Sequence, residues 1–312
     1  MVTGKAGDET ALAQPASDSV STPAIGSSAT CPSFGQSTSG SPVSCVCIGY
    51  DSAWTADSVG AVSAISEDPA DCRQFYTPVP LRFEGATEAI SSFMPAATLR
   101  VLAIDQPTIV PNTAGSRPVE RAVAGVVNSM RGGVQPANRG KIGMFDDAAP
   151  IWKLIRELGY PQSPHANRPM SGSYLLEVYP CLNLLGLVPR FLTRGECAKY
   201  NPTLATFRIE DWRSVCLLLS GYGARHRIAG LDDWARKRAE LVSPRKPDQD
   251  QVDAALSAVV AFEWAHRGLT SPAGVVVGDT ATGYMFTPAS DALAELLSAA
   301  ARRRSVPIAR LW

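Results

Sequence analysis

Two aspartates stand at the ends of short apolar segments, which is an unusual place for a charge. Asp51 follows the run VSCVCIGY, and Asp105 follows the run LRVLAI. Both runs are apolar on both faces of an extended chain, as in interior strands of a helix-covered sheet. Ligands bind at the carboxyl edge of such sheets, and parallel neighbours about 4.8 Å apart would bring the two carboxylates together. Each Asp alone is equally well explained as a turn residue, but their matching positions favour a site.

Two further segments place acids beside apolar faces. Glu177 lies near the end of the strand-like run SYLLEVYP, where an edge position facing solvent is the alternative to a buried site. In DQDQVDAALSAVV, Asp253 flanks the apolar stripe of a helix and Asp250 lies one turn earlier. The alternative for Asp250 is a first-turn acid stabilised by the helix dipole, with Asp248 as the N-cap.

This set of acids predicts a site for a hard divalent cation. Two carboxylates so close would repel each other unless one were protonated or a cation lay between them. Oxygen ligands select Mg²⁺ or Mn²⁺ over Zn²⁺, and two such ions can activate water and stabilise the leaving oxygen in phosphodiester cleavage. The expected catalytic residues are Asp51, Asp105, Glu177 and Asp253, and the expected ligands of one or two ions are Asp51, Asp105, Asp253 and, in reserve, Asp250.

The elements that must position these acids follow a mixed α/β pattern. Strands are predicted over residues 43–50, 58–65, 75–83, 99–105, 173–180, 274–278 and 283–287, and helices over 84–94, 117–131, 147–159, 209–223, 231–241, 250–268 and 290–304. The first three strands form a meander, and the prolines of the third suggest a sheet edge. We therefore expect a mixed sheet, antiparallel on one side and flanked by helices, with a mainly helical insertion at about 181–249.

Residues 1–42 differ from the rest of the chain. They are rich in Ser, Thr, Ala, Gly and Pro, with Phe34 as their one aromatic residue. Such a segment buries too little apolar surface to offset its ordering entropy, so we expect a flexible tail before one domain over 43–312.

Bulk composition gives little sign of partners. The 29 basic and 29 acidic side chains balance, so net charge does not point to nucleic acid or to a membrane. No apolar run reaches membrane-spanning length, and the N-terminus lacks the pattern of a secretion signal. The seven cysteines are scattered without a CxxC pair, which is typical of a reducing cytoplasm, so we expect a cytoplasmic protein without a membrane partner.

The order of the motifs resembles the ribonuclease H-like fold. That superfamily has a first strand ending in Asp, a meander, a second strand ending in Asp, and a late helix with DxxDA; DQVDAALSA resembles the final helix of its Holliday-junction resolvases. More closely, GYDSAWT, VLAIDQPTIVPN, SRPV, GVQPANR, LLEVYP, KYNP, DQDQVDAA and DTATGYM, over about residues 43–290, resemble domain-of-unknown-function family 429. Members of that family are regarded as predicted nucleases with this fold.

The resemblance implies specific roles for the acids. It makes Asp51 and Asp105 the strand ligands of the metal, and Asp253 with Asp250 the helix ligands, while Glu177 matches an acidic position of the closer family. It implies a metal-dependent hydrolase that acts on nucleic acid by a two-metal-ion mechanism. Whether that nucleic acid is DNA, RNA or branched stays open.

Four polar residues are candidates for binding such a substrate. Arg117, Asn138, Arg139 and Lys199 can contact phosphates, and Tyr200 beside Lys199 can contact a base. Ordinary surface charge, or a packed loop aromatic for Tyr200, is the alternative.

Two other functions use the same framework. Sugar kinases and actin-like ATPases also begin with an Asp-ended strand, but DSAWT lacks the glycine that lets backbone approach a phosphate closely. A non-catalytic module that binds nucleic acid or a protein is the other alternative. The intact set of acids argues against it, because buried carboxylates are costly in a mere scaffold.

Overall fold

The main sheet of the protein combines an antiparallel meander with parallel strands. A computed structural model describes residues 44–52, 54–166, 171–266 and 273–311, so the predicted tail 1–42 lies outside the described residues. The strands are β1 (Cys45–Asp51), β2 (Gly60–Glu67), β3 (Arg73–Leu81), β4 (Leu99–Ile104), β5 (Gly172–Glu177) and β6 (Ile228–Ala229). Their order is β5-β4-β1-β2-β3-β6, with β1, β2 and β3 antiparallel and with β4 parallel to both β1 and β5. The predicted meander is confirmed, and β1 and β4 are parallel neighbours, which is the condition under which Asp51 and Asp105 come together.

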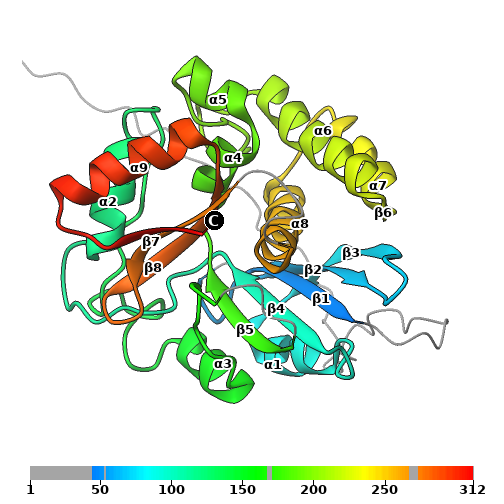
Figure 1. Ribbon diagram of the computed structural model, residues 1–312, viewed down its shortest axis with the longest axis horizontal. Helices are drawn as coiled ribbons and strands as arrows, with labels where there is room; N and C mark the ends of the chain where they lie inside the picture. Colours follow the sequence, from blue (N-terminus) through cyan, green and yellow to red (C-terminus); the bar gives the residue numbers. More distant parts are fainter. Residues whose placement is uncertain (1–43, 53, 167–170, 267–272, 312) are drawn as a thin grey trace, which may run out of the picture. The chain divides into compact units, whose positions relative to one another are not determined.

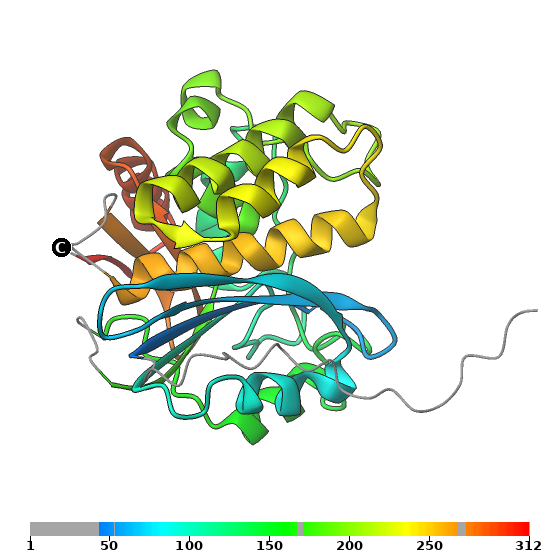
Figure 2. The ribbon, with the colours of Figure 1, turned by 90° about the vertical axis from the view of Figure 1, so that its right-hand side faces the viewer.

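Helices cover both faces of this sheet (Figures 1 and 2). On one face lies α8 (Lys246–Ala265), and on the other lie α1 (Phe83–Ser92) and α3 (Pro150–Leu158). The chain between β5 and α8 is largely helical, as predicted, and contains α4 (Pro180–Leu187), α5 (Pro189–Arg194), α6 (Ile209–His226) and α7 (Leu231–Ala239). Figure 2 shows α6 and α7 on the outer side of α8. Because α8 is covered on both sides, it is buried almost all round between Gln249 and Trp264.

A second, smaller sheet lies beside β5. It contains β7 (Ala273–Asp279), β8 (Gly283–Ala289) and β9 (Ile308–Leu311) in the order β8-β7-β9, and the helices α2 (Pro118–Val127) and α9 (Asp291–Arg303) pack against it (Figure 1). The buried Tyr284 links the two sheets, because its hydroxyl donates a hydrogen bond of 2.9 Å to the carbonyl oxygen of Leu175.

Strand alternation divides the interior into two cores. Cys47 of β1 and Val101 of β4 pack in the core beneath α8, whereas Ile48 and Leu102 pack in the core beneath α1 and α3. Gly49 lies on the α8 side. A Cβ atom there would lie 2.1 Å from the carbonyl oxygen of Ala254, so only glycine allows α8 to pass this close to β1. The close approach brings the acids of α8 to the end of β1.

Helix α8 begins earlier than predicted. Arg245 is its N-cap, and Asp248 lies at the third helical position, where its carboxylate accepts a 2.9 Å hydrogen bond from the Arg245 backbone N–H. The prediction of Asp248 as the N-cap is therefore wrong. Pro247 is compatible with the first turn of α8, because the backbone N–H groups of first-turn residues make no hydrogen bond within the helix. As a result, Asp250 lies in the second turn and not in the first.

Candidate active site

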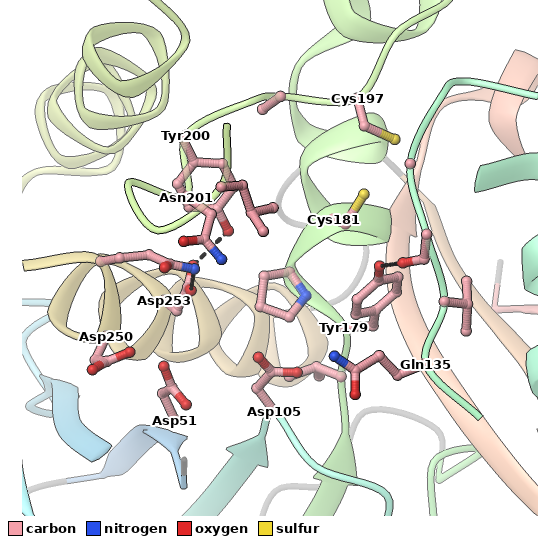
Figure 3. Close-up of a pocket in the computed structure, with 18 of the residues that line it drawn as sticks. Asp51, Asp105, Gln135, Tyr179, Cys181, Cys197, Tyr200, Asn201, Asp250 and Asp253 are labelled. Carbon is pink, nitrogen blue, oxygen red and sulfur yellow. Dashed lines mark hydrogen bonds between the residues drawn. The ribbon is translucent and has the colours of Figure 1, made fainter. Parts of the chain in front are cut away.

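A pocket of about 810 Å³ opens where β1 and β4 end. Asp51 is the last residue of β1, and Asp105 follows β4 directly, with its backbone N–H donating to the Tyr50 carbonyl at 3.0 Å. Both line the pocket, as do Asp250 and Asp253 of α8. Figure 3 shows the four side chains at one end of the pocket, two from the strands and two from the helix above them. The structure thus brings together the four acids predicted to bind a metal.

The acids of the pocket repel one another electrostatically. Burial raises the pKa of Asp105 well above its usual range, and the negative charges of Asp51 and Asp253 raise it further. Burial also raises the pKa of Asp253, to about 6. Like charges thus face each other where little water screens them, which is an environment that a cation stabilises.

Two polar neighbours fix the orientation of Asp253. The Tyr200 hydroxyl donates to Oδ1 at 2.5 Å, and the Gln249 amide donates to Oδ2 at 2.9 Å. Gln249 Oε1 is buried and has no hydrogen-bond partner among the described residues. Tyr200, predicted as a contact for a base or as a packed loop residue, is buried and holds an acid in place. Figure 3 shows its ring above α8.

A lysine that the sequence analysis missed lies among the acids. The Lys246 ammonium donates to Asp250 Oδ1 from one turn earlier in α8. Burial alone would lower the pKa of Lys246, but the carboxylates of Asp51, Asp250 and Asp253 outweigh it and raise that pKa. The i, i+4 spacing of Lys246 and Asp250 was the signal in the sequence that could have revealed this pair.

Glu177 also lines the pocket, but a buried arginine binds its carboxylate. Arg117 donates to both carboxylate oxygens, at 2.5 and 2.9 Å, and a third bond to Glu177 comes from the Thr108 backbone N–H at 2.8 Å. The same guanidinium donates to Glu120 at 2.8 Å. The register of the sheet explains why the Glu177 side chain lies apart from the aspartates. Glu177 pairs with Ile104, and the side chain of Ile104 lies in the core on the sheet face opposite α8.

The structure places one of the four predicted substrate contacts, Lys199, on the pocket wall. Arg117 is fully buried between two glutamates and presents no surface to a substrate. Asn138 donates to the Gly115 carbonyl at 2.9 Å, and Arg139 pairs with Asp147 at 2.7 Å; neither is among the described residues that line the pocket. Lys199 does line it, with its ammonium bonded to the Arg131 carbonyl.

The donor atoms suit a hard cation, although they do not form a closed cage. Among the residues that the structure describes, no three His, Cys, Asp or Glu side chains converge closely enough to hold a metal ion. Asp51, Asp105 and Asp253 nevertheless line one pocket and offer only oxygen, which fits Mg²⁺ or Mn²⁺. To share one ion, these side chains would have to come closer together than they are here.

Fold and site together define a mixed α/β protein with an acidic pocket at the carboxyl edge of its main sheet. The family model described as "Protein of unknown function (DUF429)" matches residues 60–276, and the chain belongs to this family. The matched range contains Asp105, Glu177 and Asp253, whereas Asp51 precedes it. No curated protein and no solved structure matches the chain. In the described part of the chain, no helix is long and apolar enough to cross a membrane.

Proposed function

We propose that this protein is a metal-dependent nuclease with a ribonuclease H-like fold, which hydrolyses phosphodiester bonds of nucleic acid with Mg²⁺ or Mn²⁺. The observation that carries the proposal is that Asp51, Asp105 and Asp253 come from two adjacent parallel strands and a covering helix and line one pocket. The antiparallel meander beside parallel strands, with a late acidic helix across them, supports the fold assignment. Because folds alone do not define activities, the acids carry the functional part of the proposal.

The residues of the pocket have distinct roles in this proposal. Asp51, Asp105 and Asp253 hold one or two ions, and Asp250 becomes a further ligand once Lys246 moves away from it. A bound ion supplies Lewis acidity toward the phosphate and offsets the charge of the carboxylates. Tyr200 and Gln249 keep Asp253 in position through the bonds to its two oxygens. Lys199, on the pocket wall, attracts the phosphate backbone.

Glu177 has a positioning role in this proposal. Its bidentate pairing with Arg117 holds the end of β5 against the chain that follows Asp105, because Thr108 N–H also donates to Glu177. The Arg117–Glu177 pair therefore fixes the position of the backbone next to Asp105. This replaces the catalytic role expected from the sequence.

The test is cleavage by the purified full-length chain with Mg²⁺ or Mn²⁺. Labelled single-stranded DNA, duplex DNA, RNA, RNA–DNA hybrid and branched DNA serve as substrates, each with an EDTA control. We expect Asp51→Asn to lower the cleavage rate by about 100-fold or more, because it removes a carboxylate from the metal site. Asp147→Asn is the matched control, since the Asp147 side chain is 94% exposed and pairs with Arg139 outside the pocket. Equal rates for Asp51→Asn and the wild type would refute the assignment.

The Lys246–Asp250 ion pair favours one alternative, a non-catalytic module that binds nucleic acid or a protein partner. In such a module the lysine would offset the buried acids without any metal. Nucleic-acid binding that is insensitive to EDTA, with no cleavage under either metal and no Mn²⁺-induced rise in Tm, would support the module. A rise in Tm with Mn²⁺ that Asp51→Asn abolishes would exclude it.

A further inference from the structure

Two free thiols lie near each other on the pocket wall away from the acids. Cys181 is the second residue of α4, and Cys197 lies in the segment 195–208 between α5 and α6. Both line the pocket, and Figure 3 shows their side chains near each other. The Cys181 and Cys197 thiols lie close enough for each to shift the pKa of the other.

The surroundings give the two sulfurs different acidities. The neighbouring Cys181 thiol lowers the pKa of Cys197, and the positive charges of Lys199 and Arg194 lower it further, against the effect of burial. The neighbouring Cys197 and burial raise the pKa of Cys181 well above its usual range. The pair therefore divides into a nucleophilic sulfur and a partner that keeps its proton.

A second pair of close cysteines lacks these properties. The sulfur atoms of Cys45 and Cys47 lie 3.6 Å apart, two residues apart on β1. They are packed in the core beneath α8 and are not among the described residues that line the pocket. Burial raises the pKa of Cys47 well above its usual range. Both pairs bring two thiols near each other, but Cys181 and Cys197 line the pocket and have the positive charges of Lys199 and Arg194 nearby.

We propose that Cys181 and Cys197 form a reversible redox site, which takes hydrogen peroxide as its oxidant and closes to a disulfide. The Cys197 thiolate attacks one peroxide oxygen and the O–O bond breaks; the leaving hydroxide takes up a proton to become water, and Cys197 becomes a sulfenic acid. The Cys181 sulfur then attacks the Cys197 sulfur and the S–O bond breaks, with the second hydroxide leaving as water with the Cys181 proton. Two thiols lose two electrons and one peroxide becomes two waters. A dithiol such as dithiothreitol reverses the change.

The disulfide would fasten the segment 195–208 to the start of α4. Tyr200 lies in that segment, and its hydroxyl holds Asp253 on the opposite side of the pocket. Oxidation of the thiols therefore acts on the same segment that positions one of the acids. The redox chemistry does not depend on the nuclease proposal, because its product is covalent and is detected without any assay of activity.

The test uses the reduced full-length protein treated with a small excess of hydrogen peroxide and then with N-ethylmaleimide. Before alkylation we expect a mass loss of two hydrogens per chain, and after it one cross-linked peptide pair joining Cys181 to Cys197, both reversed by dithiothreitol. The cross-link should form at least about 10-fold faster than the exposed Cys72 is oxidised, because thiolate character controls the rate. A cross-link between any other pair, or faster oxidation of Cys72 without this cross-link, would overturn the proposal.

Single variants separate the two roles. Cys181→Ser should stop at a sulfenic acid on Cys197 that dimedone traps, whereas Cys197→Ser should give neither trapped acid nor cross-link. Cys216→Ser is the matched control and should keep the cross-link, because Cys216 is buried in α6 with a pKa raised to about 12. If circular dichroism shows that a serine variant is unfolded, the alanine variant at the same position, 181 or 197, is used instead. A dimedone adduct on Cys181 in place of Cys197 would reverse the assigned roles and refute the mechanism.

Discussion

Burial of the Asp253 carboxylate in the pocket lowers the stability of the folded protein. The pKa of Asp253 is raised to about 6, compared with about 3.9 for an exposed Asp, and this difference corresponds to about 3 kcal/mol against the ionised form in the folded state. The hydrogen bonds from Tyr200 and Gln249 offset burial only in part. Such a residue is retained at a cost to the fold, which is typical of functional sites.

We expect Asp253→Asn to raise the free energy of unfolding of the metal-free protein by about 1–3 kcal/mol at pH 7.5. Asparagine removes the buried charge and still accepts the bond from Tyr200. Gln249 can turn its amide, so that Oε1, which has no partner among the described residues, accepts from the new amide. Urea denaturation in EDTA measures the change, and a variant less stable than the wild type would contradict it. Mn²⁺ should no longer stabilise this variant.

The raised pKa of Asp253 also sets a pH dependence. Because the folded state binds this proton more tightly than the unfolded state, the metal-free protein should lose stability as pH rises from about 4 through about 6. Metal binding needs the ionised acid, so the Mn²⁺-induced shift in Tm should grow as pH rises from 5 to 7.5, through the pKa of Asp253. Thermal denaturation with and without Mn²⁺ across that range is the measurement. A shift of equal size at pH 5 and 7.5 would show that Asp253 does not contribute.

Glu177 should behave as a structural residue. In Glu177→Gln the buried Arg117 keeps Glu120 but loses its bidentate partner, so we expect a loss of about 3 kcal/mol or more of stability. The dissociation constant for Mn²⁺ should change less than about threefold, because the ligands come from other residues. Denaturation and calorimetric titration at a temperature where the variant is folded test the two parts. Loss of Mn²⁺ binding by a folded variant would restore Glu177 to the ligand set.

At the scale of elements, the contact between β1 and α8 holds the site together. Gly49→Ala would place a methyl group 2.1 Å from the Ala254 carbonyl, so the helix or the strand must shift. We expect a loss of about 3 kcal/mol or more in urea denaturation, together with loss of the Mn²⁺-induced rise in Tm, because Asp253 moves away from Asp51.

Gly221→Ala is the control for this change. Gly221 lies inside α6, and a Cβ atom there meets nothing within 4 Å. Replacing a helical glycine at such a place should stabilise the protein by about 0.5–1 kcal/mol. A Gly49→Ala protein as stable as the wild type would show that the close packing of α8 on β1 is not needed.

The sequence predicted the elements with clear alternation or helical period, and with them the set of four aspartates. The carboxyl ends of neighbouring parallel strands lie at the same edge of a sheet. Asp51 and Asp105 could therefore be placed together from the positions of the strand ends in the sequence. Glu177 could not be assigned, because its partner Arg117 comes from a helix start elsewhere in the chain. The capping of α8 was misjudged because the capping acid lay at the third position and not at the first. Short elements such as α5, β6 and β9 carry too few residues to show a period.

At the scale of the whole molecule, the family match and the folded unit have different limits. The match covers residues 60–276, whereas the described part of the fold also includes β1, β8, α9 and β9. The buried Tyr284 of β8 bonds to β5 of the main sheet, and β1 lies at the centre of that sheet. The parts outside the match are therefore integral to the fold.

Two truncations test this view. Removing residues 1–42, predicted as a flexible tail, should change the free energy of unfolding by less than about 0.5 kcal/mol. Ending the chain after Asp279 removes β8, α9 and β9, exposes the apolar side of β7 and should abolish cooperative unfolding. Circular dichroism during denaturation distinguishes the two. A cooperative transition in the C-terminal truncation would mean that the main sheet is stable alone.

The wide separation of Asp51 and Asp253 along the chain has a consequence for synthesis. The first acid leaves the ribosome early, but its partner follows only after all strands of the main sheet have been made, and contacts between such distant segments form slowly. A growing polypeptide therefore holds no complete set of ligands. If the protein does cut nucleic acid, this order of assembly keeps it inert while it is still beside the messenger that encodes it.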